Sequence, residues 1–77
     1  MITIYYSPTF AKKYKKLPQT INKSAVQKEK IFRLNPHDPR LKTHKLAGKL
    51  KRYWAFSIGY NYRIIFSFTD ERVVYFH

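Results

Sequence analysis

The side chains of this 77-residue sequence that could do chemistry are cations and histidines rather than carboxylates. Sixteen lysines and arginines stand against four acidic residues, and the four (Glu29, Asp38, Asp70 and Glu71) are scattered along the chain. Paired-carboxylate catalysis and hard-metal sites are therefore not expected, and no motif of a phosphate-binding loop, a serine hydrolase or a zinc protease is present. A metal-free reaction on a phosphate would need cations to stabilise developing charge and a group that moves protons near neutral pH.

Arg63 is the most informative cation. It lies in the middle of the apolar run Tyr62-Arg63-Ile64-Ile65-Phe66, where a charge must face solvent, a carboxylate or a ligand. A second group of basic residues precedes this run and consists of Lys42, His44, Lys45, Lys49, Lys51 and Arg52. Arginine and lysine can stabilise a phosphate and histidine can move a proton, but both features are equally compatible with an ordinary solvated surface.

The net charge of +12 indicates an anionic partner, and RNA is the first candidate. A basic protein of the ribosomal type, without activity, is the alternative. The sequence contains no cysteine, so neither disulfides nor thiolate metal sites are available. The N-terminus lacks the features of a secretion signal, and no apolar run approaches the ~20 residues of a membrane span. We expect a cytoplasmic protein without cofactor, metal or membrane association.

Two helices are expected in the first half of the chain, after a strand at residues 2–6. Ser7-Pro8 is a helix start signal, and Phe10, Tyr14 and Leu17 share one helical face before Pro18 ends the helix. A second helix is predicted from Gln19 to Leu34, with Asn35-Pro36 after it. Its expected buried residues are Ile21, Ala25, Ile31, Phe32 and Leu34, with the stem of Lys28 on the apolar side.

Three strands are expected in the second half, at residues 50–58, 62–68 and 72–77, with turns at 59–61 and 69–71. The order β-αα-βββ predicts a single α+β domain over residues 1–77, an antiparallel sheet with a helical hairpin on one face. In the strand at 62–68, alternation places Tyr62, Ile64, Phe66 and Phe68 toward the core and Arg63, Ile65 and Ser67 on the open face. In the strand at 50–58, hydrophobicity alone would bury Trp54, Phe56 and Ile58.

Four segments together resemble the RelE/ParE superfamily of type II toxins, over essentially the whole chain. They are the run from Arg40 to Gly48, Lys51-Arg52-Tyr53-Trp54, Tyr62-Arg63-Ile64-Ile65-Phe66 and Val73-Val74-Tyr75-Phe76. The resemblance implies the β-αα-βββ fold and a bacterial toxin that forms a hetero-oligomer with a cognate acidic antitoxin. RelE-like members cut messenger RNA on the ribosome, without metal, by attack of a 2′-hydroxyl on the adjacent phosphate. ParE-like members share the fold but act on DNA gyrase.

The resemblance also suggests roles for individual residues. Arg63 matches the strand arginine that RelE-like toxins use against the scissile phosphate, and His44 matches an active-site histidine of the YafQ-like subgroup. The cations Lys42, Lys45, Lys49, Lys51 and Arg52 would then bind RNA. Counted from Gly48, Trp54 and Phe56 fall where RelE-like toxins carry strand lysines. This would place them with Ile65 on the open face, as contacts for the antitoxin or for bases, against the hydrophobic pattern.

One departure from the family concerns the C-terminal segment. Related toxins usually continue beyond the last strand with a segment whose histidine and tyrosine contribute to catalysis, and we expect this domain to lack it. His77 falls before that segment, so it receives no role. Three interpretations stay open: a ribosome-dependent endoribonuclease, a gyrase-directed toxin without nuclease activity, and an inactive RNA-binding relative.

Overall fold

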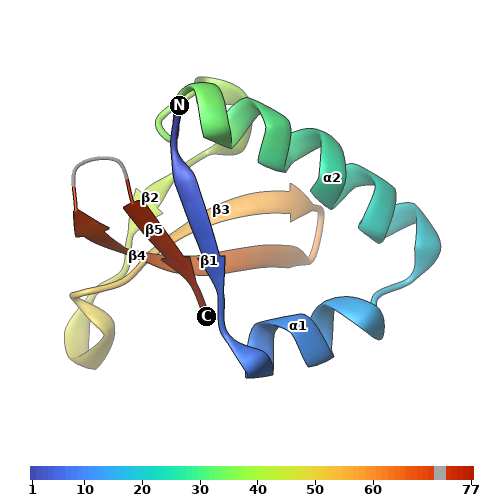
Figure 1. The fold of residues 1–77 in the computed structure, drawn as a ribbon, viewed down its shortest axis with the longest axis horizontal. Helices are drawn as coiled ribbons and strands as arrows, with labels where there is room; N and C mark the ends of the chain where they lie inside the picture. Colours follow the sequence, from blue (N-terminus) through green and yellow to red (C-terminus); the bar gives the residue numbers. More distant parts are fainter. Residues whose placement is uncertain (71–72) are drawn as a thin grey trace.

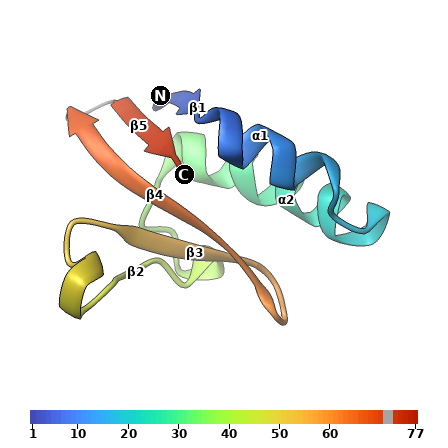
Figure 2. The same ribbon diagram turned by 90° about the horizontal axis from the view of Figure 1, so that it is seen from below.

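The protein folds as two helices on one side of a five-stranded sheet. The structure, a computed structural model, describes residues 1–70 and 73–77. Its elements in chain order are β1 (Thr3–Tyr6), α1 (Pro8–Lys15), α2 (Gln19–Leu34), β2 (His44–Lys45), β3 (Trp54–Gly59), β4 (Tyr62–Asp70) and β5 (Val73–Phe76) (Figure 1). The strands lie in the order β1-β5-β4-β3-β2, and Figure 2 shows both helices on the same side of the twisted sheet. The predicted α+β class and the order β-αα-βββ are confirmed.

The sheet departs from the prediction at its two edges. β1 pairs with β5 in parallel, whereas β2, β3, β4 and β5 form antiparallel pairs, so the sheet is mixed. β2 has only two residues, too few for a recognisable alternating pattern, and the sequence did not predict it. Two short 3-10 helices, Pro39–Leu41 and Gly48–Leu50, occupy the connection between α2 and β3. Gly48 has a φ of +68°, in the left-handed region where glycine is favoured.

The helix boundaries follow the local signals in the sequence. The backbone N–H of Phe10 donates to Ser7 Oγ at 2.9 Å, which caps α1, and Pro8 occupies the first turn. α2 begins at Gln19, directly after Pro18, and ends at Leu34, as predicted. The two helices diverge from the short turn that joins them (Figure 1).

Four phenylalanines form the centre of the core, between α2 and the sheet. Phe32 of α2 stacks on Phe56 of β3, with ring centroids 4.8 Å apart, and meets Phe66 and Phe76 edge-on at 4.9 and 5.4 Å. All four side chains are fully buried. Such rings contribute through their large buried area and their mutual geometry. They therefore fix how α2 lies across β3, β4 and β5.

Some predicted core positions lie at the surface. Leu34 is 77% exposed, because it lies two residues after Phe32 and hence about 200° round the helix from it. Tyr62 and Phe68 face the core side of β4 but are partly exposed, since they lie near the two ends of that strand. Lys28 is half-buried as expected, and its Nζ donates to the carbonyl oxygen of Arg40 at 3.2 Å.

In the second half of the chain, the observed bounds of the strands and turns differ from the predicted ones by a few residues. β3 starts at Trp54 rather than at residue 50, because a 3-10 helix and a turn take up residues 48–52. Thr69 and Asp70, predicted in a turn, continue β4, and Glu71 of that turn lies outside the described residues. Within the described part of the chain, no helix is long and apolar enough to cross a bilayer.

Candidate functional site

The open face of the sheet, opposite the helices, carries the chemistry-bearing side chains. Directly paired residues of antiparallel strands point to the same face. The pairs His44–Ala55 and Ala55–Ile65 therefore form a row across β2, β3 and β4. His77 extends this row, because its backbone N–H donates to the carbonyl oxygen of Ile65 at 2.9 Å. Arg63 lies on the same face, opposite Ser57. The predicted orientation of Arg63 and Ile65 toward the open side is confirmed.

Arg63 lines an open hollow of about 480 Å³, which we call the Arg63 hollow. It is bounded by Lys42, His44, Ser57, Gly59, Tyr60, Asn61, Tyr62 and Arg63. The Arg63 side chain is exposed and forms no hydrogen bond or ion pair with any residue that the structure describes. An unpaired guanidinium of this kind can bind a phosphate with two parallel hydrogen bonds.

Two of the predicted residues approach Arg63 in this hollow. Lys42 has a φ of 53°, an uncommon conformation for a residue with a side chain. His44 Nδ1 lies 3.1 Å from the carbonyl oxygen of Lys42, which can only accept, so Nδ1 carries the proton. In the neutral ring Nε2 is then left with a lone pair that can accept a proton. The structure thus places His44, Lys42 and Arg63 in the lining of one hollow.

A second histidine lies on the open face, and the sequence did not predict a role for it. His77 Nε2 lies 2.7 Å from Ser67 Oγ, and the His77 ring meets the Tyr53 ring edge-on at 4.8 Å. Burial lowers the pKa of His77 below its ordinary value of 6.5, because a charged ring loses solvation there. One feature of the sequence could have indicated its position. Val74 and Phe76 are apolar residues at alternate positions of the last strand, and both are buried, so alternation directs His77 to the opposite face.

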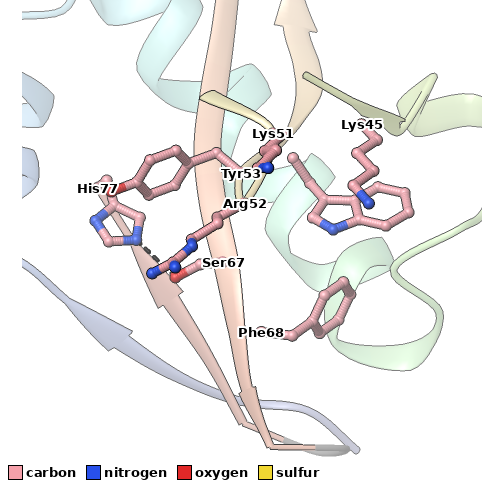
Figure 3. Close-up of a pocket in the computed structure, with 8 residues that line it drawn as sticks. Lys45, Lys51, Arg52, Tyr53, Ser67, Phe68 and His77 are labelled. Carbon is pink, nitrogen blue, oxygen red and sulfur yellow. Dashed lines mark hydrogen bonds between the residues drawn. The ribbon is translucent and has the colours of Figure 1, made fainter. Parts of the chain in front are cut away.

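His77 belongs to a second hollow of about 580 Å³, the His77 hollow. It is lined by Lys45, Lys51, Arg52, Tyr53, Trp54, Ser67, Phe68 and His77 (Figure 3). In Figure 3 the Arg52 side chain extends toward Ser67 and His77. Three of the predicted RNA-binding cations, Lys45, Lys51 and Arg52, therefore line the same hollow as His77, and none of the described residues lining either hollow is acidic.

Arg63 and His77 are close enough to line one cavity. It measures about 190 Å³, lies between α1 and β4, and is bounded by Phe10, Lys13, Tyr14, Leu17, Ile58, Tyr62, Arg63, Ile64, Ile65 and His77. The register places His44 and His77 at opposite ends of one row, with β3 and β4 between them. Arg63, two residues from Ile65, thus shares a cavity or hollow with each histidine.

The structure overturns the predicted exposure of Phe56 on the open face. Phe56 is fully buried against Phe32, so it contacts neither bases nor an antitoxin. Trp54 faces the same side and is half-buried, with its ring 5.4 Å from that of His37. The hydrophobic pattern is thus confirmed for Phe56, and the open-face position that the resemblance implied for it is wrong. The residues of this strand that point to the same side as Arg63 and Ile65 are Ser57 and Ala55, of which Ala55 is fully buried.

The remaining predicted residues differ in their position. Ile65 is half-buried on the open face, where it separates Arg63 from Ser67 along β4. Lys49 lies exposed on the 3-10 helix and lines neither hollow. The sequence therefore predicted the cations of both hollows but not their division between two hollows.

Two acidic residues form ion pairs with arginines that line neither hollow. Glu29 pairs with Arg33 at 3.1 Å, and Asp38 pairs with Arg40 at 2.9 Å. Hydrogen bonds from Arg40 lower the pKa of Asp38 to about 2. Among residues 1–70 and 73–77, no group of three or more His, Asp or Glu side chains gathers as metal ligands would. The open face therefore presents a strongly positive field.

Comparison with known proteins identifies the fold. No protein-family model matches the chain, and no curated protein matches it. Among solved structures, YoeB from a heterotetrameric YoeB–YefM toxin–antitoxin complex of Staphylococcus aureus is 20% identical. It superposes with a TM-score of 0.77, covering 99% of this chain and 91% of that one. A YoeB/ParE toxin from Agrobacterium tumefaciens is 12% identical, with a TM-score of 0.77 over 99% of this chain and 93% of that one.

A third structure extends the comparison. A mutant of YafQ from E. coli is 20% identical, with a TM-score of 0.67 over 99% of this chain and 88% of that one. At such identities the likeness concerns the backbone arrangement and not the side chains of the site. The chain has the fold shared by these YoeB, YafQ and ParE-type toxins.

Proposed function

We propose that this protein is the toxin of a type II toxin–antitoxin system and that it cleaves messenger RNA on the ribosome without a metal ion. The observation that carries this proposal is the unpaired Arg63 on an open face that also presents His44 and His77. The resemblance of the sequence to RelE-like toxins and the shared fold support the same reading. The surrounding cations supply the attraction for an RNA backbone.

The proposed reaction is an attack of the ribose 2′-oxygen on the adjacent phosphorus. The O2′–P bond forms, the P–O5′ bond breaks, and the products carry a 2′,3′-cyclic phosphate and a 5′-hydroxyl. Arg63 stabilises the negative charge that develops on the phosphate oxygens. His77 takes the proton of the 2′-hydroxyl, because burial favours its neutral form. The 5′-oxygen that leaves is protonated by water, and His44, at the far end of the row, helps to position the RNA.

We propose further that an acidic antitoxin neutralises the protein. The S. aureus YoeB structure is a complex with YefM. In this chain, the cations of the two hollows have no carboxylate among the described residues that line them. Co-expression with the acidic product of an adjacent small gene should restore the growth of cells that express this protein. Growth that stays arrested, although the two proteins are made together, would contradict this partner.

Arg63→Ala should lower the rate of RNA cleavage by about 10²–10³-fold, the usual loss when one donor to a developing oxyanion is removed. Induced expression of the wild type should arrest growth and cut translated messages, and the variant should do neither. Message cleavage is measured by mapping RNA 5′ ends in induced cells. Lys30→Ala is the matched control, because it removes one positive charge from an exposed position of α2.

Two outcomes would contradict the proposal. If Arg63→Ala arrests growth and cuts messages as the wild type does, Arg63 is not the phosphate-stabilising group. If the wild type arrests growth while messages stay intact and gyrase–DNA cleavage complexes accumulate, the protein acts on gyrase instead.

A further inference from the structure

Tyr60 is the most exposed large apolar side chain among the described residues. Its ring is 100% exposed at the tip of the hairpin that joins β3 and β4. Short hairpin turns favour glycine, asparagine and aspartate, which Gly59 and Asn61 provide on either side of it. Neither the turn nor the core therefore calls for an aromatic residue at this position.

The neighbours of Tyr60 are those of a nucleic-acid site. Tyr60 lines the Arg63 hollow together with Lys42, His44 and Arg63, and Tyr62, 37% exposed, lines it as well. None of the described residues around this hollow is acidic. Proteins that hold single strands combine cations that follow the phosphates with aromatic rings on which the bases stack. An acidic peptide would form ion pairs with the cations but would give the exposed ring of Tyr60 no stacking partner.

We propose that the Arg63 hollow is a nucleotide subsite in which Tyr60 stacks on an unpaired base of the strand whose phosphate Arg63 holds. The proposal rests on the proposed function for the identity of the ligand, single-stranded RNA. Tyr60 at the rim provides the stacking surface, and Arg63 and Lys42 neutralise the backbone. Stacking accepts every base, so this contact positions the strand without selecting a sequence.

The test measures binding rather than cleavage. The probe is a 2′-O-methyl oligouridine, which cannot be cut because the attacking hydroxyl is blocked, and binding is followed by fluorescence anisotropy. A second probe carries the same phosphates with abasic residues in place of the bases. Tyr60→Leu should weaken binding of the first probe about tenfold, because the stacking contact with one base is lost. Tyr60→Phe should bind like the wild type, because it keeps the ring.

The controls separate stacking from other effects. The abasic probe should bind equally to the wild type, Tyr60→Leu and Tyr60→Phe. Tyr5→Leu should leave both affinities unchanged, because Tyr5 is an exposed tyrosine on β1, at the sheet edge separated from β3 by β5 and β4.

Three results would overturn the proposal: an equal loss on both probes, no loss on either, or a wild type that binds the abasic probe as well as the oligouridine. The cleavage mechanism is tested separately, because binding to an uncleavable strand does not depend on it. An Arg63→Ala variant that still cuts messages would contradict the mechanism and leave the stacking result standing.

Discussion

Replacing His77 with glutamine should lower the rate of RNA cleavage by about 10²–10⁴-fold, the range expected for the loss of a proton-transfer group. Glutamine can keep a hydrogen bond to Ser67 Oγ, which lies 2.7 Å from His77 Nε2, but it cannot exchange a proton near neutral pH. The variant should therefore fold and bind RNA normally. Single-turnover cleavage of a translated message, with circular dichroism as the check of folding, measures the effect.

The pH dependence distinguishes a catalytic His77 from a merely structural one. Its folded-state pKa lies below 6.5, so the rate should fall with decreasing pH only below that value. In His77→Gln this acidic limb should disappear, whereas in His44→Gln, the matched histidine, it should persist. If His77→Gln keeps both the rate and the limb, another group takes the proton.

The same pKa shift has a consequence for stability. The folded protein binds fewer protons than the unfolded chain, because burial disfavours the charged ring. The contribution of His77 to stability is therefore complete above about pH 6.5 and is lost as the pH falls through the lower, folded-state pKa.

Phe32→Ala should lower the free energy of unfolding by about 3–5 kcal/mol, the usual cost of removing a fully buried phenylalanine. Phe32 contacts Phe56, Phe66 and Phe76 at once, so its removal leaves a cavity between α2 and three strands. A domain of this size has a total stability of roughly 4–12 kcal/mol, so the variant should lose at least about a quarter of it. Urea denaturation followed by circular dichroism measures the change.

Leu34→Ala is the matched control for Phe32→Ala. It also shortens a large apolar side chain of α2, but Leu34 is 77% exposed and should change stability by no more than about 0.5 kcal/mol. Comparable losses in the two variants would show that α2 does not pack on the sheet through Phe32.

Local signals in the sequence were sufficient for most of the fold. Ser7-Pro8, Pro18 and Asn35-Pro36 set the helix boundaries, and alternation in residues 62–68 separated Ile64 and Phe66 from Arg63 and Ile65. The parallel pairing of β1 with β5 joins the two ends of the chain, which no local pattern reports. Leu34 was misplaced because it is apolar but lies two residues after Phe32, on nearly the opposite side of α2.

Only part of the candidate site could be predicted from the sequence, because some of its contacts depend on how the strands pair. Arg63 was predicted because a charged residue within an apolar strand must face solvent, a carboxylate or a ligand. Phe56 was misplaced because its position was taken from the resemblance, whereas its own hydrophobicity pointed to the core. His77 contacts Ser67 through the pairing of β4 with β5, and it contacts the ring of Tyr53, which lies far from it in the sequence. These contacts depend on the three-dimensional fold, so the sequence alone did not predict them.

The chemistry of the cut ends tests the proposed mechanism most directly. Purified protein is added to a reconstituted translation reaction, and the termini of the cleaved message are identified. Attack by the 2′-hydroxyl predicts a 2′,3′-cyclic phosphate or its hydrolysis product and a 5′-hydroxyl, and a single 2′-deoxynucleotide at the cleaved position should block the cut. Ends that carry a 3′-hydroxyl and a 5′-phosphate, or a cut that proceeds at the deoxynucleotide, would contradict the mechanism built on Arg63 and His77.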